Sequence, residues 1–136
     1  QNFEALNNRC WLRAINDEDM NAALADCNAA VRASPQYAAA LDSRGLVHLK
    51  RGEFQEALAD YETAAALEPG RGHYLYGRGL ARERIGMIAE GQADLAAAEI
   101  AEPGVTQAFA GYGYIPAVGM TNAASLPAAP ATPGKP

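Results

Sequence analysis

The chain has 136 residues, of which 49% are hydrophobic and 20% charged, so it is long enough for one domain with an apolar core. Its formal net charge of -5 argues against nucleic-acid binding, because that binding depends on Lys and Arg residues that neutralise phosphates. No apolar run approaches the roughly 18 residues that mark a membrane-spanning helix, so we expect no membrane insertion.

The first unit of the chain, residues 4–37, predicts two helices with a polar break at 16–19. Asp and Asn are favoured as helix N-caps, because their side chains accept hydrogen bonds from unpaired backbone N–H groups. The break therefore predicts the start of a second helix. Pro35 predicts its end, since proline cannot continue a helix interior.

The second unit, residues 38–71, shows the same layout most clearly. We predict a first helix at 38–50 that ends before Gly52, a residue suited to the left-handed position after a helix. Apolar residues then recur at spacings of three and four over 54–67, which predicts a second, amphipathic helix that ends before Pro69.

The third unit, residues 72–105, repeats this scheme with its break at Ile85 and Gly86. A short helix at 106–112 should cap the stack, with three aromatic side chains covering the exposed end of the third unit: Phe109, Tyr112 and Tyr114. Alanine-rich composition and few β-branched or aromatic residues favour helix throughout. We therefore predict an all-α fold.

The three units are in register at a shift of 34 residues. Five positions carry the same residue in all three units: Leu12, Leu46 and Leu80; Ala25, Ala59 and Ala93; Asp26, Asp60 and Asp94; Ala30, Ala64 and Ala98; Pro35, Pro69 and Pro103. A fixed period of this length is typical of stacked helical repeats.

This layout resembles the tetratricopeptide repeat family over about residues 4–105. In the middle unit the pattern is carried by Leu41, Gly45, Ala57, Tyr61, Ala64 and Pro69, with departures at Arg44 and His48. The resemblance implies a solenoid of three antiparallel helix pairs over residues 1–114, with units at about 4–37, 38–71 and 72–105 and a cap at 106–114.

In the family, the first helices line a concave groove that binds a peptide. Carried onto this sequence, the resemblance implies these groove positions: Asn8, Leu12, Asp42, Leu46, Lys50, His73, Tyr76, Leu80 and Arg84. The leucine row would supply apolar anchors; the alternative is that these leucines pack between repeats. The positions of the family's carboxylate clamp carry no fixed positive charge, so we expect no clamp: Asn8, Leu12, Ser43, His73 and Gly77.

Arg44 and Arg78 stand where the family usually has leucine, and the aspartate row offers them partners. We hypothesise Arg–Asp pairs, within a unit or between neighbours, that fix helix register. On this hypothesis Arg44→Leu should change stability little, whereas Asp60→Ala should leave a charge unpaired.

The two cysteines, Cys10 and Cys27, lie on the two helices of the first unit, at positions that face each other in a family repeat. That placement allows a disulfide; two buried free thiols are the alternative. Their spacing from His48 and His73 does not suit a zinc site, and no catalytic constellation stands out. We expect no cofactor and no enzymatic activity.

The tail, residues 115–136, is rich in Ala and Pro, and its prolines from Pro127 onward recur every third residue, as suits a polyproline II linker. A further hypothesis is that 115–126 folds back into the groove of its own chain or of a neighbour, the latter giving self-association.

The function expected on this basis is a non-catalytic module that binds a peptide or partner protein; the alternative is a spacer or substrate-positioning domain of a larger enzyme. Because the sequence starts at Gln1, we interpret it as a processed product or a fragment. It resembles exported bacterial three-repeat proteins, which favours the periplasm over the cytoplasm without deciding between them.

Overall fold

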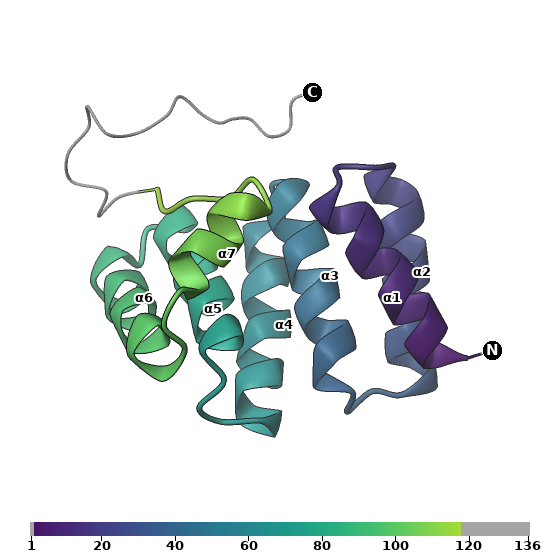
Figure 1. Ribbon diagram of the computed structural model, residues 1–136, viewed down its shortest axis with the longest axis horizontal. Helices are drawn as coiled ribbons and strands as arrows, with labels where there is room; N and C mark the ends of the chain where they lie inside the picture. The colour runs from purple at the N-terminus through teal and green to yellow at the C-terminus, as the bar shows by residue number, and fades with distance from the viewer. Residues whose placement is uncertain (1, 118–136) are drawn as a thin grey trace.

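The computed structural model describes residues 2–117, and all regular structure in that range is helical (Figure 1). The seven helices are α1 (Phe3–Ile15), α2 (Met20–Ala33), α3 (Ala38–Lys50), α4 (Phe54–Leu67), α5 (Gly72–Arg84), α6 (Ile88–Ala101) and α7 (Val105–Gly111). These bounds confirm the predicted breaks between helices. The predicted tail beyond residue 117 lies outside the described residues.

The helices are arranged as three antiparallel pairs stacked side by side, as Figure 1 shows from purple α1 to green α6. Each helix packs on its pair partner, and α2 and α4 also pack on the first helix of the following pair. The first helices α1, α3 and α5 touch one another in sequence, whereas α2, α4 and α6 do not. The stack therefore curves with its first helices on the inside, as expected for a helical-repeat solenoid.

The sequence sets the helix ends in two ways. In the first unit, the side chains of Asn2 and Asp19 accept hydrogen bonds of 3.0 Å from the backbone N–H groups of Ala5 and Ala22. In the second and third units the chain turns through Gly52 and Gly86, both at positive φ, where a side chain would be strained.

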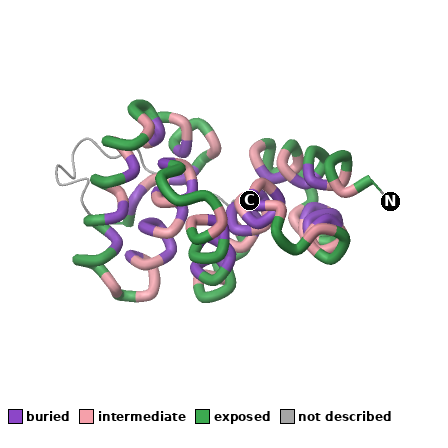
Figure 2. Tube along the Cα trace, turned by 90° about the horizontal axis from the view of Figure 1, so that it is seen from below, coloured by how far each residue is buried: buried purple, intermediate pink, exposed green. Residues whose placement is uncertain are grey.

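Small residues allow the helices to approach closely, and Tyr61 fills the space at the centre. The alanine row of Ala30, Ala64 and Ala98 is fully buried. The Tyr61 ring lies between Gly45 on α3 and Gly77 on α5, with no room for a Cβ atom at either glycine. Figure 2 shows the resulting pattern, with buried segments facing between helices and exposed ones outward.

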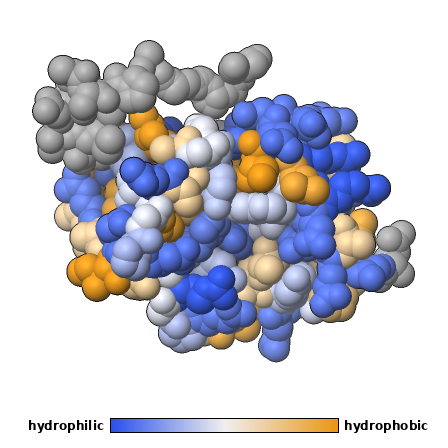
Figure 3. Space-filling model, viewed as in Figure 1, coloured by the Kyte–Doolittle hydropathy of each residue, from blue (hydrophilic) through white to orange (hydrophobic). Residues whose placement is uncertain are grey.

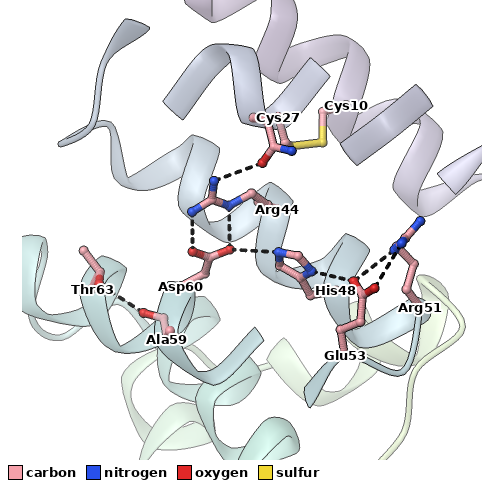
Figure 4. Close-up of polar contacts among 10 residues, drawn as sticks. Cys10, Cys27, Arg44, His48, Arg51, Glu53, Ala59, Asp60 and Thr63 are labelled. Atoms are coloured by element: carbon pink, nitrogen blue, oxygen red, sulfur yellow. Dashed lines mark hydrogen bonds and ion pairs between the residues drawn. A yellow bond between two sulfur atoms is a disulfide. The ribbon is translucent and has the colours of Figure 1, made fainter. Parts of the chain in front are cut away.

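The hypothesised Arg–Asp pairs are present, and each lies within one unit. Arg44 donates two hydrogen bonds of 2.8 Å to Asp60, from Nε and Nη2 (Figure 4), and Arg78 donates bonds of 3.0 and 2.9 Å to Asp94. Arg44 also donates to Asn28 of the preceding unit at 3.1 Å. Each pair therefore fixes the register of its two helices, and Arg44 ties two units together.

The first unit has an equivalent pair that the sequence analysis did not identify. Asp26 is buried and accepts hydrogen bonds of 2.8 Å from both Arg9 and Arg13. The bond from Arg9 is the main reason why the pKa of Asp26 lies below its ordinary value. The pair was missed because Arg9 stands one residue out of the register of Arg44 and Arg78.

Cys10 and Cys27 form a disulfide that joins α1 to α2, with Cα atoms 5.5 Å apart (Figure 4). Both residues are fully buried in the core. Of the two alternatives left open by the sequence, the disulfide is the one observed.

Reduction of this disulfide should lower the free energy of unfolding by about 3 kcal/mol, because the crosslink restricts the unfolded chain over a sequence separation of 17. The measurement is thermal unfolding with and without reductant. A Cys10→Ala/Cys27→Ala variant serves as the control and should not respond to reductant. An unchanged melting temperature for the reduced wild type would contradict the prediction.

Candidate functional site

The surfaces of α1, α3 and α5 on the inside of the curve form one continuous face, here called the inner face. It corresponds to the groove expected from the sequence. In Figure 1, α7 lies in front of α5 and the chain then passes the end of α3. Residues 112–117, here called the strap, continue from α7 and contact the inner face through Tyr112, Tyr114 and Ala117. The site is therefore partly filled by the chain itself.

Phe109 packs on the third unit as the sequence analysis expected, whereas Tyr112 and Tyr114 also reach the first and second units. Phe109 is fully buried and its ring centroid lies 4.8 Å from that of Tyr76 and 4.6 Å from that of His73, both on α5. Tyr112 reaches Trp11 on α1, with ring centroids 5.0 Å apart. These side chains pack on the inner face across the units, where apolar rings and polar partners are available to them.

The row of leucines is also placed differently from the expectation. Leu46 and Leu80 have 0% exposure and belong to the core cluster that contains Phe109 and Tyr114. They are therefore core residues in this conformation, as the alternative interpretation held. Leu12 occupies the equivalent position on α1, yet it is 54% exposed.

Lys50, another expected groove residue, has a structural role. Its ammonium group donates hydrogen bonds of 2.8 Å to the carbonyl oxygen of Ala14 and 2.7 Å to Asp17, which joins the ends of α1 and α3. The side chain is 2% exposed. Asn8, by contrast, is exposed to solvent on α1. The expected groove residues thus range from buried ones on α3 and α5 through half-buried ones to exposed ones on α1.

His73 connects three parts of the inner face. Its Nδ1 lies 3.0 Å from Asp42 Oδ1 on α3, and its Nε2 lies 3.2 Å from the hydroxyl oxygen of Tyr112. Burial disfavours the imidazolium, but the hydrogen bond and charge of Asp42, helped by the charge of Glu102, outweigh it and raise the pKa of His73. The positive charge of Arg71 opposes this shift.

The raised pKa of His73 predicts that the fold loses stability as the pH rises. Protonation of His73 contributes stability fully below its unfolded pKa of 6.5, and this contribution is lost as the pH passes through the higher folded pKa. Melting temperatures between about pH 6 and pH 9 test this. An Asp42→Asn variant should flatten the dependence, and an unaltered profile in that variant would contradict the assignment.

Arg84 and Tyr114 form a second contact between the strap and the inner face. The Tyr114 hydroxyl donates to the carbonyl oxygen of Leu49 at 3.1 Å, and Arg84 Nη1 donates to the same hydroxyl at 3.3 Å. The guanidinium lies over the Tyr114 ring, 4.9 Å from its centroid. Arg84 was an expected groove residue. Tyr114 was expected only to cap the third unit. The close spacing of the aromatic residues Tyr112 and Tyr114 after α7 was the one sequence feature that could have indicated a contact with the inner face.

Two backbone groups of the strap are held by side chains at the end of α5. Arg84 Nη2 donates to the carbonyl oxygen of Ile115 at 3.0 Å, and Glu83 Oε1 accepts from the N–H of Ala117 at 2.9 Å. Pro116 between them is buried. The inner face therefore holds the strap, which turns at Tyr112 and Gly113, by both its tyrosine side chains and its backbone.

Two other kinds of feature, a metal site and a membrane-spanning helix, are absent from residues 2–117. No group of three or more His, Cys, Asp or Glu side chains in this range could hold a metal ion. None of the helices described is long and apolar enough to span a membrane.

Comparison with known proteins agrees with this architecture. Residues 38–71, which contain α3 and α4, match the tetratricopeptide repeat family. No curated protein matches the sequence. The pairs α1–α2 and α5–α6 repeat the arrangement of the matched pair on either side of it. The chain therefore carries a tetratricopeptide repeat at residues 38–71, in a helical stack consistent with that family throughout.

Proposed function

We propose that this chain is a non-catalytic protein–protein interaction module that binds a peptide or segment of a partner protein on its inner face. Tetratricopeptide repeats generally act as interaction modules and are generally non-catalytic, which supports the class of function. The observation that carries the proposal is that the inner face already holds a polypeptide segment, the strap, by side-chain and backbone contacts.

The uncovered part of the inner face favours a site that begins on α1. Leu12 is equivalent to Leu46 and Leu80, which are buried in one cluster with Phe109 and Tyr114, but among residues 2–117 the Leu12 side chain stays 54% exposed. In Figure 3 much of this side of the molecule is hydrophilic, and one of its hydrophobic areas lies over the region of α1 and α3. A partner segment would extend the row of aromatic and aliphatic contacts over Leu12.

Affinity capture with two matched variants tests the proposal. Leu12→Glu places a charge on the uncovered inner face, and Ile100→Glu makes the same change at an 83% exposed aliphatic residue on α6. A partner retained by the wild type and by Ile100→Glu, but lost by Leu12→Glu, would support the proposal. Both variants should first be shown by circular dichroism to be folded. Retention by all three proteins would place binding elsewhere, and retention by none would favour the spacer role.

A further inference from the structure

The strap and α7 differ in how firmly they are held. α7 is anchored by Val105 and Phe109, which are both buried in the core. The strap begins after Gly111 and turns at Gly113, where φ is +90°, and both glycines are exposed. Helix α7 is thus anchored by two buried side chains, whereas Tyr114 is the buried side chain of the strap that belongs to the core cluster, and we expect the strap to pivot at its exposed glycines.

The strap presents two tyrosines, two residues apart, to two separate positions on the inner face. Tyr112 packs its ring on Trp11 and directs its hydroxyl group to His73. Tyr114 is buried, packs under the guanidinium of Arg84 and donates to the carbonyl oxygen of Leu49. Each position thus offers an apolar surface for a ring together with a polar partner for its hydroxyl, which is the chemistry of tyrosine recognition.

The residues after the tyrosines are recognised in a different way. At Ile115 the polar contact is to the backbone carbonyl, from Arg84, and at Ala117 it is to the backbone N–H, from Glu83. The intervening Pro116 is buried, which is compatible with proline because it has no backbone N–H to leave unpaired. Backbone contacts give affinity with little side-chain selectivity, so selectivity comes from the tyrosines and the proline.

We infer that the inner face is specific for an uncharged segment with the pattern Tyr-x-Tyr-aliphatic-Pro that turns at x, and that the strap is an internal ligand that competes with a partner peptide of this kind. The inference rests on the proposed function and names the chemistry of its partner. It applies to the part of the inner face between Trp11 and Glu83.

Competition by the strap determines how such a partner binds. A tethered segment has a high effective concentration, so the inner face is open for only a fraction of the time. The apparent dissociation constant of a partner is its intrinsic value divided by that fraction. Substitutions that weaken the strap should therefore tighten the binding of a partner peptide, although they change no residue of α1, α3 or α5.

The experiment measures binding of a labelled synthetic peptide with the sequence of residues 109–117 to the full chain. The release variant is Tyr112→Ala/Tyr114→Ala, which removes both tyrosine anchors of the strap. We expect it to bind the peptide at least about tenfold more tightly than the wild type. Tyr37→Ala is the matched control, because Tyr37 contacts Phe3 at the far end of α1, and it should bind like the wild type. Adding Arg84→Gln to the release variant should abolish the gain.

Release of the strap can be followed independently through Trp11, the only tryptophan in the chain, because its ring packs on Tyr112. If Trp11 emission reports release and the peptide still does not bind, the inferred ligand chemistry is wrong. A partner sensitive to Leu12→Glu would then still support the proposed function. Equal peptide affinity for the wild type and the release variant would overturn the competition, and a gain that survives Arg84→Gln would overturn the binding position.

Discussion

Replacing Gly45 by alanine should lower the free energy of unfolding by about 2 kcal/mol or more, the range of strain from an overpacked core. A Cβ atom at Gly45 would lie 2.6 Å from the nearest carbon of the Tyr61 ring. The ring cannot move away, because its opposite edge is equally close to Gly77 on α5. Since alanine normally favours a helix over glycine by about 1 kcal/mol, a loss here would be due to packing.

Gly111→Ala is the matched control, because Gly111 is also helical and a Cβ atom there meets nothing within 4 Å. It should leave the denaturant midpoint unchanged or raise it slightly. A Gly45→Ala/Tyr61→Leu double variant should lose less stability than the two single variants together, because the smaller side chain relieves the contact. A stable Gly45→Ala protein would show that α3 and α4 can separate without cost.

Arg44→Leu should destabilise the fold by about 3 kcal/mol, more than Asp60→Ala. The structure thus reverses the expectation from the sequence. The Asp60 side chain is 7% exposed, and besides Arg44 the basic side chain near it is that of His48, whose Nε2 lies 3.8 Å from Asp60 Oδ2. The Arg44 side chain is 23% exposed, so its charge can still be solvated when Asp60 is removed. It also keeps its hydrogen bond to Asn28. The loss of stability is larger when the side chain left without a partner is the more deeply buried of the two.

Urea unfolding of the two single variants and of Arg44→Leu/Asp60→Leu would test this. The double variant replaces both charges by apolar groups and should recover most of the stability that Arg44→Leu loses. Asp60→Asn keeps an acceptor for Arg44 and should cost less than Asp60→Ala. A larger loss for Asp60→Ala than for Arg44→Leu would contradict the argument from burial.

The sequence by itself determined the secondary structure and the repeat. The breaks predicted at 16–19, 51–52 and 85–86 separate the observed helices, the two helices predicted for the second unit have the observed bounds, and the predicted helix at 106–112 lies within one residue of α7. These features are local: caps, turn glycines and helical periodicity depend on residues a few positions apart. The Arg–Asp pairs were also foreseen, because they follow from the same register.

Only the tertiary structure decided what lies on the inner face. Tyr114 bonds to Leu49 and Tyr112 packs on Trp11, contacts between residues far apart in sequence that no local pattern encodes. Leu46 and Leu80 are fully buried in the cluster that also contains Phe109 and Tyr114; the register gave their positions on the helix but not their neighbours. Leu12, with the same register, stays exposed because the strap reaches only as far as Trp11. Repeat sequences fix which way each side chain points, whereas its solvent exposure depends on the segments that pack against it.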